Sequence, residues 1–129
     1  MIEKTLAEDG SLLSLKWRSK RLTTSLVCVP PKPGLYAFGW DKKSHLGLNA
    51  QRTYVYIGQT DNLRRRLGQH LPKSEINSKL KKFLIDHRNQ GKCWYCPLPE
   101  TLSSHTSRLK LEEELIKFFA PAINIKNNS

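Results

Sequence analysis

The side chains best suited to phosphate chemistry lie in two stretches expected to be helical. The first, DNLRRRLGQH, carries three consecutive arginines and ends in a histidine. At about 100° per residue, Arg66 and His70 share one stripe of this helix, beside its apolar stripe. A guanidinium held at the edge of a core suits bidentate contact with a phosphate. Arg64 and Arg65 point away from this stripe, and they are expected to contact either solvent or phosphate.

The second stretch, residues 107–119, directs one carboxylate inward. When Leu111 defines the origin of a helical wheel, the apolar residues fill an arc from about 340° to about 160°, with Glu112 near its middle at about 100°. The next two glutamates fall on the polar side. A carboxylate among apolar side chains is unfavourable by several kcal/mol unless a cation, a metal or hydrogen-bond donors meet it. Glu112 is therefore either half of a buried salt bridge, for example with Arg66, or an anchor for a divalent metal.

Tyrosines recur on the expected strands. Because strand residues alternate between faces, Tyr54 and Tyr56 are predicted to share one face, with Gly58 next along it. A glycine there would let a ligand approach the backbone. Aromatic side chains on strands, Tyr36 among them, are more often core or cross-strand partners, so the tyrosines alone do not define a site.

Composition favours one basic intracellular domain. The 129 residues carry 22 Lys and Arg against 11 Asp and Glu, a formal charge of +11. Such a field attracts polyanions, nucleic acid above all. No apolar run is long enough to span a membrane, and the acidic N-terminus MIEKTLAEDG does not resemble a secretory signal. We expect a cytoplasmic protein that does not bind membranes.

The three cysteines do not predict a metal or disulfide framework. Cys28, Cys93 and Cys96 are few and odd in number, which favours reduced thiols. Cys93 and Cys96 form a CxxC pattern on an expected strand, where positions three apart face opposite sides about 10 Å apart.

Turn and cap residues divide the chain into alternating strands and helices. Strands are predicted at 34–40, 53–58 and near KCWYCP, the first two as an antiparallel hairpin. Helices are predicted from the QTDN cap to Pro72, over about 74–89, and over 107–119. The middle helix carries Lys79 and Lys82 on its outer side. Residues 1–32 form an N-terminal extension that ends in the proline-rich PPKPG.

Several short motifs together resemble the GIY-YIG nuclease family. They are GLY at 34–36, YIG at 56–58, an arginine ten residues after the YIG tyrosine, a histidine four later, and LEEELIKFFAPAIN, which resembles the closing signature. Any one of them is weak, but ordered agreement across four segments is specific. The resemblance implies an α/β (α+β) fold, a small three-stranded antiparallel sheet flanked by helices. It assigns 33–129 to the nuclease domain and 1–32 to a β-rich extension packed on it.

By this resemblance the reaction is metal-dependent endonucleolytic hydrolysis of DNA, with Mg²⁺ or Mn²⁺ held by Glu112. Tyr56 would be the general base, although an unperturbed phenol has a pKa of about 10. Arg66 would neutralise charge on the phosphoryl oxygens. The implied catalytic site is built from Tyr36, Tyr56, Arg66, His70, Glu112 and Asn124, and the expected substrate contacts are Gly58, Arg64, Arg65, Lys79 and Lys82.

Two departures from the family pattern are visible. Leu35 replaces the usual isoleucine, a volume-conserving change. Gln59 stands where some members carry a lysine that assists the base, which leaves base activation open. The motif signature continues otherwise unbroken to Asn124.

Two other functions remain open from sequence. A noncatalytic nucleic-acid-binding module would keep the fold and the charge, and an RNA-cleaving nuclease would use the same residues. No appended targeting motif is visible, so specificity is expected to come from residues 1–32, the basic middle helix, a homodimer or a partner. No small-molecule cofactor is expected.

Overall fold

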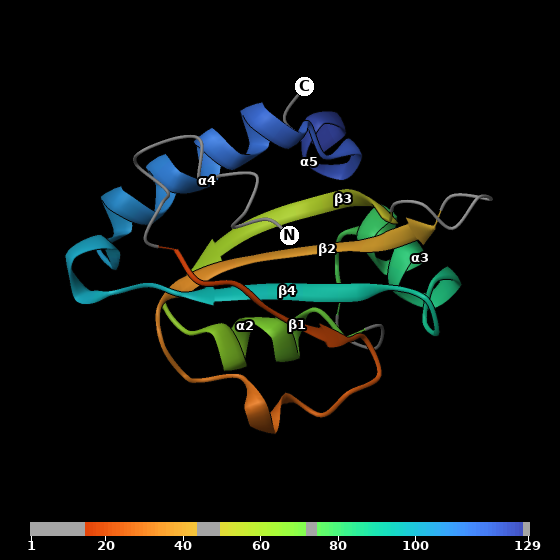
Figure 1. Ribbon diagram of the computed structural model, residues 1–129, viewed down its shortest axis with the longest axis horizontal. Coiled ribbons are helices and arrows are strands. Elements are labelled where there is room, and N and C mark those ends of the chain that lie inside the picture. Colours follow the sequence, from red (N-terminus) through yellow and green to blue (C-terminus); the bar gives the residue numbers. More distant parts are fainter. Residues whose placement is uncertain (1–14, 44–49, 72–74, 128–129) are drawn as a thin grey trace.

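The computed structural model describes residues 15–43, 50–71 and 75–127. Four antiparallel strands form one sheet in the order β1-β4-β2-β3 (Figure 1). They are β1 (Arg18–Arg21), β2 (Gly34–Lys43), β3 (Ala50–Thr60) and β4 (Lys92–Pro97). The predicted α/β class and antiparallel sheet are confirmed, with a fourth strand that comes from the N-terminal segment. Residues 44–49 of the expected loop, Pro72 and residues 1–14 of the extension lie outside this description.

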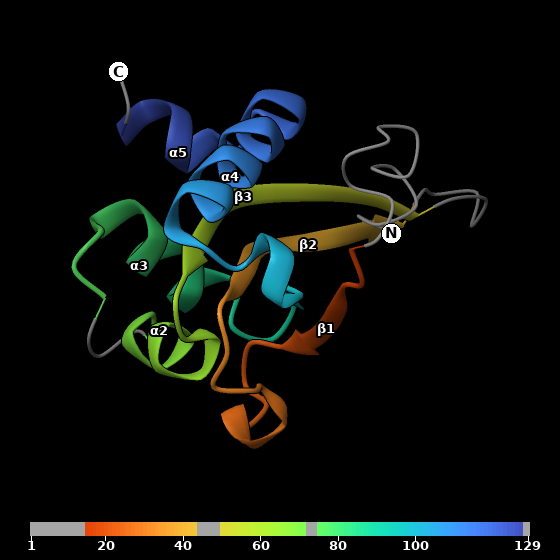
Figure 2. The same cartoon turned by 90° about the vertical axis from the view of Figure 1, so that its left-hand side faces the viewer.

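Helices cover both faces of the sheet. One face carries α2 (Leu63–Gln69) and α3 (Ser78–Asp86), and the other carries α4 (His105–Phe119) (Figures 1 and 2). The short α5 (Ala122–Asn127) packs against β3, the edge strand. Two 3₁₀ turns, η2 (Leu26–Cys28) and η3 (Glu100–Leu102), complete the elements. Among these described helices, none has the length and apolar character needed to cross a bilayer.

Polar caps decide where the helices begin. The Asn62 side chain accepts from the Arg65 amide at 3.0 Å and starts α2 within the predicted QTDN segment. The middle helix α3 is shorter at both ends than the expected 74–89. It begins late because the Asn77 side chain caps the amides of Lys79 and Leu80. Ile76 therefore precedes the helix and is 96% exposed.

A β-bulge overturns the prediction that Tyr54 and Tyr56 face the same side. Phe38 pairs with Tyr56 but the next residue, Gly39, pairs with Tyr54, so Val55 is an extra residue on β3. An extra residue reverses the alternation beyond it. Tyr54 packs in the core under α4, whereas Tyr56 packs with the cluster under α2 and α3. Only one of the two tyrosines can therefore join a site beside α2.

The turn after α4 brings α5 back over the sheet edge. Ala120 adopts a left-handed conformation (φ 46°, ψ 55°) as the C-cap, and its amide donates to the Ile116 carbonyl at 2.8 Å. Pro121 follows fully buried and cannot extend the helix. The chain then re-enters a helix whose Asn124 faces β3.

Candidate active site

A chain of four polar side chains crosses the buried end of α2. Tyr36 Oη lies 2.8 Å from His70 Nε2, and Arg66 Nε donates to the same hydroxyl at 3.3 Å. The other ring nitrogen of His70 contacts the carboxylate of Glu75. Tyr36 comes from β2, Arg66 from α2, and His70 is the residue that ends α2. The fold therefore joins motifs that lie far apart in sequence.

The surroundings of this chain determine where its protons reside. Burial lowers the pKa of His70, and its hydrogen bond with Glu75 only partly opposes this. A neutral ring that donates from Nδ1 to Glu75 has an unprotonated Nε2, which accepts a hydrogen bond from the Tyr36 hydroxyl. Burial also raises the pKa of Tyr36 far above its usual value. Tyr36 therefore stays a phenol, suited to positioning and not to proton abstraction.

Tyr56 and Glu112 bring an acid and a carboxylate to the same place. Both are half-buried, and burial raises the pKa of each. For Tyr56, nearby Arg66 lowers the pKa while Glu112 raises it, so all three groups lie within electrostatic reach. A hydrogen bond from the Gln59 backbone partly stabilises the Glu112 carboxylate. Among the described residues Glu112 forms no ion pair with Arg66 or with any other cation, which disfavours the salt-bridge alternative.

Asn124 closes the free edge of β3. Its Oδ1 accepts from the Ile57 amide at 2.7 Å, and its Nδ2 donates to the Ile57 carbonyl at 2.8 Å. Ile57 is adjacent to both Tyr56 and Gly58 in the YIG motif. The side-chain amide thus makes the hydrogen bonds that a neighbouring strand would make. It fixes the backbone next to Tyr56.

The expected substrate contacts are less uniform than the sequence suggested. Arg64 donates to the Val29 and Val27 carbonyls at 2.8 and 3.3 Å and ties η2 to α2, while Arg65 pairs with Asp61. Lys79 and Lys82 lie exposed on α3, in the structure as in the prediction.

Gly58 was expected to leave room for substrate, but that room is filled by Tyr36. A Cβ on Gly58 would lie 2.4 Å from both Cζ and Oη of Tyr36. The two residues are register partners on β3 and β2. The glycine is therefore needed for the packing of a site tyrosine.

Two buried charged residues near the site have no counterpart in the sequence interpretation. Glu75 is 8% exposed and orients His70, and its other oxygen accepts from the Asn77 amide at 2.9 Å. Arg108 is 9% exposed, and its Nε donates to Gln59 Oε1 at 2.8 Å while Nη1 donates to the Ser103 carbonyl at 2.5 Å. No local signal identified Glu75. Arg108 lies at about 60° on the same wheel that singled out Glu112, so its inward direction was readable.

Divalent metal would have one described carboxylate to bind. Within residues 15–43, 50–71 and 75–127, no group of three His, Cys, Asp or Glu side chains is placed to hold an ion. Mg²⁺ is commonly bound by one or two carboxylates, with waters and substrate phosphates completing its shell. A half-buried Glu112 without a cationic partner fits that mode of binding.

Gly58→Ala is expected to destabilise the protein by about 1–3 kcal/mol, the usual effect of overpacking a filled core. The Tyr36 hydroxyl would also be pushed from His70 and Arg66. Gly68→Ala is the matched control, because its nearest new contact is an ordinary 3.6 Å to Leu26 Cδ1. Urea denaturation of both variants measures the difference. Equal stabilities would contradict the packing role of Gly58.

Stability should fall on acidification through the titration of His70. Burial lowers the pKa of His70 in the folded protein. Below a pH of about 6.5, His70 of the unfolded chain therefore binds a proton while His70 of the folded protein stays neutral. The stability that the neutral, buried His70 contributes is fully present above that pH. It is lost progressively as the pH falls to the lowered pKa of the folded protein. Melting temperatures of wild type and His70→Gln between pH 7.5 and 5 should converge as the pH falls. Parallel curves would refute a neutral, buried His70.

Asn124→Ala is expected to lower the free energy of unfolding by about 2–6 kcal/mol, because two buried backbone groups lose their partners at about 1–3 kcal/mol each. Asn124→Asp should be intermediate in stability, since it can still accept from the Ile57 amide. Hydrogen exchange of that amide, followed by NMR, should accelerate in the alanine variant. Unchanged protection would show that Asn124 does not hold the strand edge.

Comparison with known proteins identifies the family of this chain. The model of the GIY-YIG catalytic domain matches residues 46–127. UvrABC system protein C of Tropheryma whipplei is 30% identical over 98 residues, which cover 76% of this chain but 14% of that protein. The chain thus spans about a seventh of the length of this curated relative.

Solved structures agree on the fold. The GIY-YIG N-terminal endonuclease domain of UvrC from Thermotoga maritima, bound to its catalytic magnesium, aligns with a TM-score of 0.53 and 19% identity, over 79% of this chain and 93% of that one. A point mutant of the same domain aligns with a TM-score of 0.52. Family match, relative and fold all lead to one conclusion: the chain belongs to the GIY-YIG family.

Proposed function

We propose that this protein is a metal-dependent endonuclease that hydrolyses phosphodiester bonds in DNA. The observation that carries the proposal is the cluster in which the Tyr36 hydroxyl contacts both Arg66 and His70, with the Tyr56 ring centroid 5.7 Å from that of His70. Glu112 lies within electrostatic reach of Tyr56. A hydroxyl, a cation and a carboxylate that meet at one edge of the sheet are the groups that phosphodiester hydrolysis requires.

Each side chain has a distinct part in the proposed reaction. Tyr56 would take a proton from the attacking water in its phenolate form and become a neutral phenol. Arg66, whose Nε donates to the Tyr36 hydroxyl, would stabilise charge on the phosphoryl oxygens. Tyr36 and His70 hold that guanidinium and the phosphate in place. Glu112 would hold a divalent ion, which would supply Lewis acidity and would offset the negative charge that raises the pKa of Tyr56.

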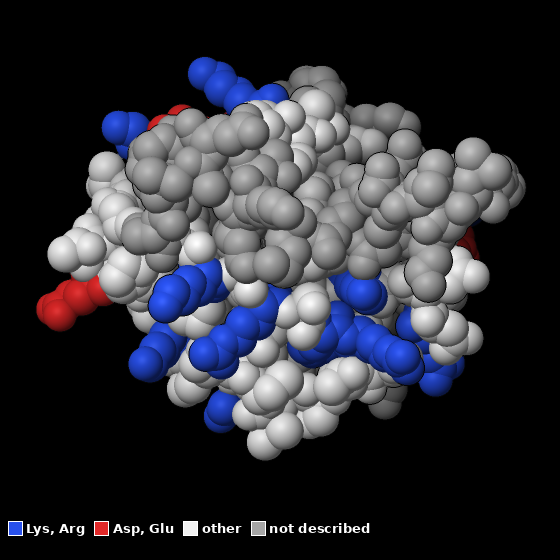
Figure 3. All heavy atoms as spheres, viewed as in Figure 1, with Lys and Arg blue, Asp and Glu red and all other residues white. Residues whose placement is uncertain are grey.

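The surface charge supports a nucleic-acid substrate. Figure 3 shows Lys and Arg side chains gathered over β1, whose sequence RSKR exposes Arg18 and Arg21. With a formal charge of +11, binding should weaken steeply with salt as counterions are released. The domain of Thermotoga maritima UvrC that shares the fold binds magnesium as its catalytic cation, which supports the same ion here.

The direct test is cleavage of supercoiled plasmid, single-stranded DNA and a matched RNA, each with Mg²⁺, with Mn²⁺ and with EDTA. We expect DNA cleavage with either metal and none with EDTA. DNA binding without cleavage under any condition would identify a noncatalytic module. Faster cleavage of RNA would change the proposed substrate.

A further inference from the structure

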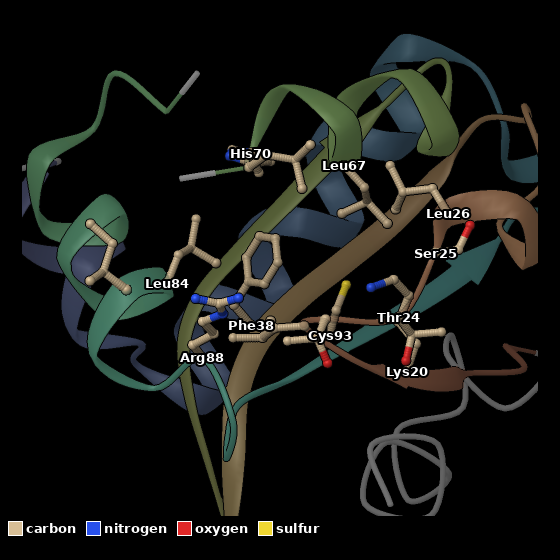
Figure 4. A pocket seen from close by; sticks show the side chains of 14 residues that line it. Lys20, Thr24, Ser25, Leu26, Phe38, Leu67, His70, Leu84, Arg88 and Cys93 are labelled. Atoms are coloured by element: carbon tan, nitrogen blue, oxygen red, sulfur yellow. The ribbon is translucent and has the colours of Figure 1, made fainter. Parts of the chain in front are cut away.

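A cavity of about 750 Å³ opens beside the proposed active site, on the face of the sheet covered by α2 and α3. Its floor is Phe38 and Cys93, and its walls include Leu67 of α2 and Leu84 of α3 (Figure 4). The segment 22–26 closes the remaining side. This volume lies within the range of about 300–1,000 Å³ typical of ligand sites.

The charges around the cavity all have one sign. Figure 4 shows Lys20 and Arg88 reaching toward it from opposite sides, with the Phe38 ring between them. Among the described residues that line it, none is acidic. Lys20 is half-buried, and desolvation lowers its pKa. Its Nζ donates to the Arg21 carbonyl at 2.8 Å, and an anion would add a countercharge to this ammonium. Burial raises the pKa of Cys93 to about 12, which keeps that thiol neutral. The cavity therefore suits a ligand with a flat apolar body and an anionic group.

His70 connects this cavity to the proposed site. The same residue lines the cavity and contacts the Tyr36 hydroxyl. The Phe38 and Tyr36 ring centroids are 5.9 Å apart, and each lies within 5.4 Å of the His70 ring centroid. A group seated on Phe38 would thus be one side chain away from the phosphate that Arg66 and Tyr56 would engage.

We propose that this cavity receives one unpaired nucleobase of the substrate strand, held among the apolar side chains that line it, with the flanking phosphates against Lys20 and Arg88. The inference rests on the proposed function, in which the substrate is DNA. A paired base reaches such a cavity only after unstacking, which opposes binding by a few kcal/mol and least for a base that is already unpaired. The protein is therefore selective for strands with an unpaired base near the cleaved bond.

Binding without metal tests the proposal apart from catalysis. Fluorescence anisotropy in EDTA compares a perfect duplex with one that contains a single-base bulge. We expect the bulged duplex to bind at least about tenfold more tightly, since 1.4 kcal/mol corresponds to a factor of ten. Equal affinities would overturn the proposal.

Two matched pairs of variants locate the preference. Ile85→Trp fills the cavity mouth and should abolish the preference for the bulged duplex, whereas Ile76→Trp, outside the cavity, should retain it. Lys20→Ala should weaken binding of the bulged duplex more than Lys117→Ala does, although each removes one charge. A preference that survives in Ile85→Trp would overturn the proposal.

A photoreactive 5-iodouracil at the bulge supplies an independent readout. Irradiation of the wild-type complex should crosslink the base to the peptide that contains Phe38, and a crosslink confined to other peptides would overturn the proposal. Binding of free dAMP is measured in a second experiment. If it binds the cavity and the bulged strand has no advantage, the site is for a soluble nucleotide and the proposal fails.

The outcomes separate this inference from the proposed function. Bulge-selective binding without metal-dependent cleavage would support the cavity and refute the nuclease. Metal-dependent cleavage with equal binding of both duplexes would support the nuclease and refute the role of the cavity. No binding to any DNA would overturn both.

Discussion

Replacing Glu112 by glutamine is expected to reduce metal-dependent cleavage by about 10³-fold or more, while the folded protein becomes no less stable. The two effects have one cause. Burial raises the pKa of Glu112, and no described cation pairs with it, so the charge is unfavourable for folding in the absence of metal. Glutamine removes the charge and keeps the shape, which removes metal binding without leaving a cation unpaired.

Three measurements on Glu112→Gln make this prediction sharp. They are single-turnover cleavage, Mn²⁺ affinity by calorimetry, and the urea midpoint without metal. Glu113→Gln, one residue along and exposed, is the matched control and should cut at the wild-type rate. A loss of several kcal/mol in stability without a loss of Mn²⁺ binding would restore the salt-bridge alternative.

Arg66→Lys is expected to lower kcat by about 10²–10³-fold with little effect on KM. Arg66 Nε already donates to the Tyr36 hydroxyl and Nη1 to Gln69 Oε1 at 3.1 Å, so the planar group is oriented before substrate arrives. A lysine keeps the charge but cannot make these contacts and also present a fork to phosphate.

Arg65→Ala provides the comparison within the same run of arginines. Arg65 is exposed and paired only with Asp61 among the described contacts, so its loss should raise KM and reduce the salt slope by about one unit, with kcat maintained. Similar kcat losses in both variants would show that the three arginines act as one electrostatic patch. Melting temperatures of both should stay near that of the wild type.

The helical spacing of the chain predicted which arginine and which glutamate turn toward the core. The helical period alone separated Arg66 from Arg64 and Arg65, and separated Glu112 from the two glutamates that follow it. Family spacing then connected these residues to Tyr36 and Asn124. In the structure Arg66 and Glu112 are half-buried while Arg65 and Glu113 are exposed, and the catalytic roles of these residues stay predictions. The directions agree because an α-helix has a fixed period, so the direction of a side chain on one helix depends on few distant contacts.

Only the tertiary structure decided how the strands and loops complete the site. The Val55 bulge placed Tyr54 and Tyr56 on opposite faces, although strict alternation predicted one face. Glu75 meets His70 from an irregular segment, and Gly58 meets Tyr36 across strands.

Arg108 and the cavity beside His70 also arise from contacts between distant segments. The sequence by itself determined the family, the sign of the charge and the inward direction of Arg66 and Glu112. Strand register, the orientation of His70 and the shape of the cavity required the fold, because each depends on residues from separate elements that no local period relates.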